Sequence, residues 1–157
     1  MKYLLLIPLL ISNFAFADLS AANFFMTWMP YSNFAGADLF SSNMEQATLF
    51  GSNFHGANLQ GANFAQADLS MSNLSLTQLN RANFENTKLS HANLLHAKMY
   101  GANLEGADLS YSNLSHTMLT NTNLKGANLY GVNIDRTVFN NATWDRETVW
   151  PEGFYFG

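Results

Sequence analysis

Apolar residues recur at every fifth position of the chain from residue 14 to residue 149, with no insertion or deletion in the register. Each five-residue unit contains a small residue, then Asn or Asp, then Leu or Phe, and finally two variable residues, as residues 101–110 illustrate. A helix would space its apolar residues three and four apart, and a half-buried strand would alternate them with a period of two. The period of five therefore predicts neither a continuous helix nor a continuous strand.

The small residue and the apolar residue of each unit are two positions apart, so both side chains point to the same side of a short extended segment. The polar residue between them points away, and the last two residues are free to turn a corner. Repetition of this unit winds the chain into coils stacked at the spacing of neighbouring strands, about 4.8 Å. Such repeats cannot bury an apolar face alone, but stacked neighbours share one continuous core.

The polar position has a second period of ten residues. It is Asn in every second unit and varies in the units between them. The constant positions are Asn23, Asn33, Asn43, Asn53, Asn63, Asn73, Asn83, Asn93, Asn103, Asn113, Asn123 and Asn133. We predict that these side chains stack coil over coil and bond to one another and to the turn backbone, as structural ladders rather than as a binding site.

The unit A-[N/D]-[L/F]-x-x resembles that of the pentapeptide-repeat family over residues 19 to about 154. The resemblance implies an all-β fold, a right-handed four-sided parallel β-helix with four units to a coil. This gives about seven coils over about 30 Å at the strand spacing. Residues 148–154 also resemble a closing segment common at the C-termini of such helices. The expected organisation is a repeat region over 18–149 and a closing segment over 150–157.

With four units to a coil, steps of twenty residues define the expected core columns. One column runs from Phe24 to Trp144 and its neighbour from Met29 to Val149. Phe is concentrated in the N-terminal half, where we expect a stacked aromatic ladder. The repeat-region glycines fall at the corner positions, where a permissive backbone is needed.

Residues 1–17 are typical of a secretory signal peptide. Lys2 precedes an apolar run over 3–11, and Ala15 and Ala17 place small residues at the expected cleavage point before Asp18. The run is too short to span a bilayer, so no membrane span is expected in the mature chain. We predict an exported protein, periplasmic or secreted, cleaved after Ala17. The alternative is an uncleaved first coil, because residues 12–14 and 17–19 already fit the repeat.

The chain has few charged residues for one that is so rich in hydrophobic residues. Of the 157 residues, 48% are hydrophobic and 11% charged, with a formal net charge of −4. This charge argues against a binder of nucleic acid or of anionic membranes. No cysteine is present, so neither a disulfide nor a lipidated cysteine anchor is expected.

Candidate chemistry is sparse, and the sequence predicts no enzyme and no cofactor. No catalytic triad pattern, phosphate-binding loop or HExxH motif occurs. His96 and His116 are twenty residues apart and should stack; a metal-binding module there is one alternative, and a solvated pair on a corner is favoured. A second alternative is a DNA-mimicking topoisomerase inhibitor, as some family members are. Its acidic column would be Glu45, Glu85, Glu105 and Asp145, interrupted by Ala65 and Lys125.

Large aromatic side chains at outward positions are the most informative surface feature, since clusters of exposed apolar groups mark contacts. The candidate partner surface consists of Phe25, Trp28, Tyr31, Phe40, Phe50, Tyr100, Tyr111 and Tyr130. At the C-terminus, Trp150, Phe154, Tyr155 and Phe156 are expected to cap the coil or to meet a second copy in an end-to-end homodimer. The favoured function is a non-enzymatic exported scaffold that binds a protein or a surface.

Overall fold

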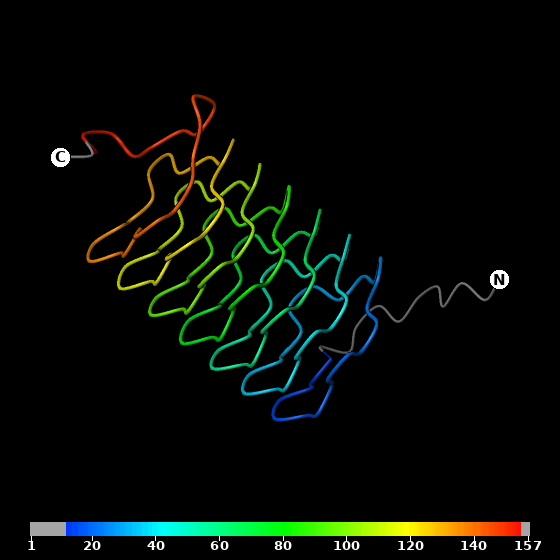
Figure 1. Cartoon of the computed structure of the whole chain (residues 1–157). Coiled ribbons are helices and arrows are strands. Elements are labelled where there is room, and N and C mark those ends of the chain that lie inside the picture. Colours follow the sequence, from blue (N-terminus) through cyan, green and yellow to red (C-terminus); the bar gives the residue numbers. More distant parts are fainter. Residues whose placement is uncertain (1–11, 155–157) are drawn as a thin grey trace.

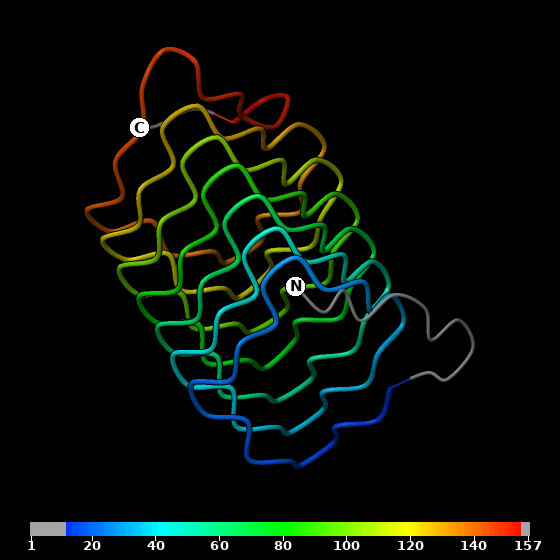
Figure 2. The same ribbon diagram turned by 90° about the vertical axis from the view of Figure 1, so that its right-hand side faces the viewer.

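The computed structural model describes residues 12–154, which wind into a right-handed four-sided parallel β-helix, as predicted (Figure 1). Figure 2 shows the coils stacked along one axis from the N-terminal to the C-terminal end. Within residues 12–154 there is no helix, and each side of a coil contributes one bridge residue rather than a longer strand. None of these residues therefore belongs to a helix long and apolar enough to cross a membrane.

Parallel bridges join each polar position to the same position of the next coil. They connect residues twenty apart, from Asn13 with Asn33 through Asn123 with Thr143. Backbone N–H groups join the same neighbouring coils, as when Leu69 donates to the carbonyl of Lys88, nineteen residues further on, at 2.8 Å. One coil is thus four five-residue units, and every side is a ladder of short strand pairs.

The corners have a left-handed backbone in every regular unit. Gly126 has a φ of 64°, and many non-glycine residues at the equivalent position have a similar positive φ, such as Leu76 at 59°. A turn bond closes most corners, for example from the Ala37 N–H to the Phe34 carbonyl at 3.0 Å. The glycines lie at corners as predicted, but other residues outnumber them there, although left-handed backbone costs an L-residue about 1–2 kcal/mol. The coil-to-coil bonds impose this geometry.

The apolar columns are fully buried through the middle of the rod. Leu and Phe at the central positions, and Ala, Ser and Thr at the small positions, form one continuous core. The predicted aromatic ladder is present: Phe34 and Phe54 stack with centroids 4.8 Å apart, and Phe64 and Phe84 at 5.1 Å. Burial of each such side chain contributes about 1.5–3 kcal/mol.

The two Asn ladders are also present. Asn73 donates from Nδ2 to Oδ1 of Asn53 at 3.2 Å, and Asn103 does the same to Asn83 at 3.1 Å on the other constant side. Each Oδ1 also accepts a backbone N–H two residues further on, as Asn103 does from Glu105 at 3.2 Å. The ladders therefore fix the coil spacing and the corner conformation together.

The prediction of an uninterrupted register fails at the last coil. Asn128 pairs with Val149, twenty-one residues away, so one extra residue enters after Thr143. Val149 consequently points outward and is 45% exposed, while Thr148 takes the buried small position and Trp150 the inward one. Trp144, the last member of its predicted core column, is also exposed.

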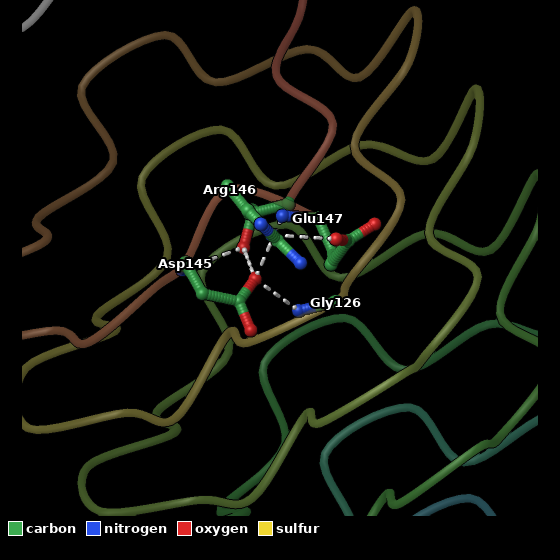
Figure 3. A network of polar contacts seen from close by, with 5 residues as sticks. Gly126, Asp145, Arg146 and Glu147 are labelled. Carbon is green, nitrogen blue, oxygen red and sulfur yellow. Dashed lines mark hydrogen bonds and ion pairs between the residues drawn. The ribbon is translucent and has the colours of Figure 1, made fainter.

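Asp145 organises the turn that holds the extra residue (Figure 3). Its Oδ1 accepts N–H groups from Gly126 at 3.0 Å and from Glu147 at 3.1 Å, and also the Thr148 hydroxyl at 3.2 Å. The Gly126 bond is the main cause that lowers the pKa of the Asp145 carboxyl, against partial desolvation. Beyond this turn, Trp150 packs on Phe139 at 5.5 Å and on Phe154 at 5.0 Å, and so covers the last coil.

At the other end, residues 12–17 have the conformation of the coil. Asn13 bridges to Asn33, and the Phe14 ring stacks on Phe34 at 4.9 Å. The rest of the predicted signal peptide, residues 1–11, lies outside the described residues, as do Tyr155 and Phe156. Cleavage after Ala17 would remove part of a coil and uncover one face of the Phe34 ring.

We predict that Asn73→Ala lowers the free energy of unfolding by about 3–4 kcal/mol, since the side chain makes four hydrogen bonds, including one from the Ser75 N–H, and each is worth about 1 kcal/mol. Asn73 donates to Asn53, and its Oδ1 accepts from Asn93 and from the buried Ser75. Denaturant unfolding measures the change. Gln78→Ala, on a variable side, is the matched control and should cost less than about 0.5 kcal/mol. Equal costs would contradict a structural role for the ladder.

Candidate interaction surface

The variable side chains of the rod are gathered on its four corners, where the last two residues of each unit project. Residues twenty apart share a corner, and residues ten apart lie on diagonally opposite corners. The structure therefore separates the eight predicted aromatic residues into distinct groups. Four of them share one corner, two share the diagonally opposite corner, and Phe25 and Trp28 lie exposed near the N-terminal end.

The first group forms an aromatic ridge, which consists of Tyr31, Phe50, Met71, His91, Tyr111 and Tyr130. Backbone bonds follow the ridge from coil to coil, as from Tyr31 N–H to the Phe50 carbonyl at 2.8 Å and from Tyr111 N–H to that of Tyr130 at 2.9 Å. Tyr31, Met71 and Tyr111 are 58%, 59% and 55% exposed. The ridge is thus a line of exposed apolar surface along the axis of the rod.

The rings of the ridge are held in place. Tyr31 meets Phe50 edge to face at 5.5 Å, and Tyr111 meets Tyr130 in the same way at 5.5 Å. Phe50 is accordingly half-buried, less exposed than the sequence suggests. The Tyr31 ring also lies over Gly51, where an added Cβ would stand 2.7 Å from the ring, and Tyr111 lies over Gly131 in the same way. These two glycines leave the space in which the rings lie flat.

His91 and Met71 belong to the ridge, although neither was predicted from the sequence as a surface contact residue. The His91 ring stacks on Tyr111 with centroids 5.3 Å apart. Steps of twenty from Tyr31 reach both residues, so the signal was present in the register.

Desolvation, and secondarily the neighbouring Tyr130, raises the pKa of the Tyr111 hydroxyl.

Phe40 and Tyr100 line a shallow groove on the diagonally opposite corner. We call this depression the amide groove. It is lined by Phe40, Ser41, Gln60, Gly61, Asn80, Arg81 and Tyr100. The sequence predicted the two aromatic residues as surface groups, but not that they bound one depression.

The predicted histidine pair is stacked as expected, with His96 and His116 centroids 4.6 Å apart and the rings tilted by 32°. Stacked rings direct their nitrogen lone pairs side by side rather than toward one point, and a zinc site needs three or four converging ligands. Within residues 12–154, no group of three or more His, Asp and Glu side chains could hold a metal ion.

The predicted acidic column also exists, but two of its carboxylates are already bonded. Asn63 donates to Oε2 of Glu45 at 3.0 Å, and Asn123 donates to Oε2 of Glu105 at 2.9 Å. Lys125 and Ala65 lie in the same column. This corner therefore does not present a continuous line of free carboxylates.

Comparison with known proteins identifies the repeat. Residues 12–56, 57–94 and 97–136 match the family model described as pentapeptide repeats, in eight copies. A comparison with curated protein sequences gives no match.

Solved structures similar to this chain include the following two proteins. One is a pentapeptide repeat protein from the thylakoid lumen of Arabidopsis thaliana, 33% identical over 55% of this chain, with a TM-score of 0.54. The match covers 61% of that protein, less than two thirds of its length. The other is a trypsin-treated form of QnrB1, a plasmid-mediated fluoroquinolone resistance protein. It is 21% identical over 85% of this chain and 77% of its own, with a TM-score of 0.62, which shows the fold alone.

Proposed function

Since the chain belongs to the pentapeptide-repeat family, we propose that it is a non-enzymatic exported scaffold that binds a protein partner through the aromatic ridge. Proteins of this family generally serve as structural or interaction scaffolds. The observation that carries the proposal is the ridge itself. Clusters of exposed large apolar side chains tend to mark contacts, and Tyr is enriched at the centre of interfaces.

The side chains of the ridge are already held in place, which favours binding. Edge-to-face contacts hold Tyr31 against Phe50 and Tyr111 against Tyr130. The rings of Tyr31 and Tyr111 also pack over the corner glycines of the next coil. Side chains that are already ordered lose less rotamer freedom on association, so more of the contact energy contributes to affinity. The partner we infer has an apolar groove or strip that can lie along the rod axis.

Export is the second part of the proposal. The leader pattern of residues 1–17 supports it, and the likeness to a thylakoid lumen protein is in keeping with a protein that crosses a membrane. Cleavage after Ala17 would leave a first coil that begins at Asp18, with Phe34 partly uncovered. An end-to-end homodimer through the capped C-terminal coil stays a prediction.

The DNA-mimicking alternative has weaker support. Such a mimic needs a regular line of exposed negative charge, whereas Ala65 and Lys125 interrupt the acidic column. The likeness to QnrB1 concerns the fold and adds nothing to this alternative.

We expect the double variant Tyr31→Ser plus Tyr111→Ser to capture at least tenfold less partner than the wild type, since a central interface tyrosine contributes about 2 kcal/mol or more. The measurement is quantitative affinity capture from the extracytoplasmic fraction. Tyr100→Ser, a similarly exposed tyrosine away from the ridge, is the matched control and should retain capture. Equal recovery with the double variant and the wild type would exclude the ridge.

We also expect the mature protein to begin at Asp18, as determined by N-terminal sequencing and intact mass of the protein from the extracytoplasmic fraction. A mature chain that retains residues 12–17 would contradict the predicted cleavage site and would agree with the coil that these residues form. Recovery of the protein only from the cytoplasm would contradict export.

A further inference from the structure

We propose that the amide groove binds an acidic oligosaccharide. The groove is open to solvent, has a volume of about 560 Å³, and lies on the corner diagonally opposite the aromatic ridge. It is independent of the ridge, so the two proposals can fail separately. The inference depends on the spacing of the two aromatic rings, the free polar groups between them, and the charge beside them.

The groove has an aromatic residue at each end and a polar floor. Phe40, Gln60, Asn80 and Tyr100 occupy the same corner position in four successive coils, and backbone bonds from Ser41 to Gln60 and from Arg81 to Tyr100 connect them. Three coil steps place the two aromatic positions about 14 Å apart at the strand spacing. Both rings are about half exposed, and Gly61 keeps the floor low between them. This length suits a short chain of sugar rings, whose C–H faces pack on aromatic rings.

The floor offers hydrogen bonds of the kind that hydroxyl groups need. Gln60 donates from Nε2 to Gln78 at 3.1 Å and to Asn58 at 3.2 Å, and the Asn80 Oδ1 accepts the Tyr100 N–H at 3.1 Å. These bonds hold the two amides in place. Within residues 12–154 they leave the Gln60 Oε1 and the Asn80 Nδ2 without a partner. A sugar hydroxyl both donates and accepts, so it matches one free acceptor and one free donor group.

Arg81 gives the groove its preference for an acidic ligand. The two ion pairs of residues 12–154 are Arg136 with Asp135 and Arg146 with Glu147, so Arg81 has no carboxylate partner there. Lys98 adds a second exposed cation two residues before Tyr100 at one end of the groove, whereas the exposed Asp38 lies at the equivalent place before Phe40 at the other end. A guanidinium binds a carboxylate through two parallel hydrogen bonds. In a chain of net charge −4, the positive charge at the Tyr100 end of the groove favours a uronic or sialic acid unit over a neutral sugar at that end.

An acidic peptide suits the groove less well. Peptides that bind along β-structure pair with free backbone groups at a sheet edge. At this corner the N–H groups of Ser41, Gly61 and Arg81 already bond to the next coil at 2.9–3.0 Å. Only side chains are left for recognition, which favours a ligand that bonds through hydroxyl and carboxylate groups.

The test is binding of the labelled full-length protein to an array of uronate- and sialate-containing oligosaccharides, their neutral counterparts, and acidic tyrosine-containing peptides. Titration calorimetry with the best-bound oligosaccharide follows. We expect the acidic oligosaccharides to bind in preference to the neutral ones. Arg81→Gln should weaken binding about tenfold, which corresponds to about 1.4 kcal/mol. Phe40→Ser and Tyr100→Ser should weaken it at least as much.

Tyr130→Ser, on the aromatic ridge, is the matched control and should bind the oligosaccharide as the wild type does. Thermal unfolding of each variant shows that the rod is intact, since all four side chains are exposed. The proposal is overturned if no acidic oligosaccharide binds, if neutral sugars bind equally well, if the groove variants bind like the wild type, or if the peptides bind in place of the sugars. Loss of partner capture in the ridge variants has no bearing on this outcome.

Discussion

Stacking of equivalent positions twenty residues apart is the constraint on which this structure depends. Each coil donates backbone N–H groups to the next, and the apolar columns and Asn ladders repeat at the same interval. No coil could bury its apolar residues by itself, so the stability belongs to the contacts between coils. The same constraint explains the left-handed corners, which non-glycine residues adopt at a cost because the coil-to-coil bonds require that geometry.

This arrangement also determines where function can reside. The small, polar and apolar positions of each unit are committed to the core and the ladders, so the corner residues and the outward residues of the variable sides remain free to vary. The aromatic ridge and the amide groove lie on diagonally opposite corners of one rigid rod. Such a rod could hold a protein partner on one corner and an acidic oligosaccharide on the other without contact between the two ligands.

Most of the fold could be predicted from the sequence because the five-residue and ten-residue periods encode it directly. The one-residue register shift before Val149 could not be predicted, because it depends on the hydrogen bonds by which Asp145 holds an extra residue in one turn. The surface was predicted less completely. Individual exposed aromatics were recognisable, but Met71 and His91 join the ridge only when the corner is followed in steps of twenty. The groove requires Phe40 and Tyr100 to be placed three coils apart with small and amide side chains between them.

The absence of cysteine from the chain allows a direct test of the twenty-residue coil. Gln78 and Lys98 are bridged in adjacent coils, whereas Gln78 and Lys88 lie on opposite sides of the rod. The measurement is disulfide formation after mild oxidation, followed by mass spectrometry of the digested monomer. The spacing of adjacent strands is within the Cα–Cα range of disulfides, about 4.4–6.8 Å. Gln78→Cys plus Lys98→Cys should cross-link within one chain, and Gln78→Cys plus Lys88→Cys should not. A cross-link in the second pair, or none in the first, would contradict the four-sided coil.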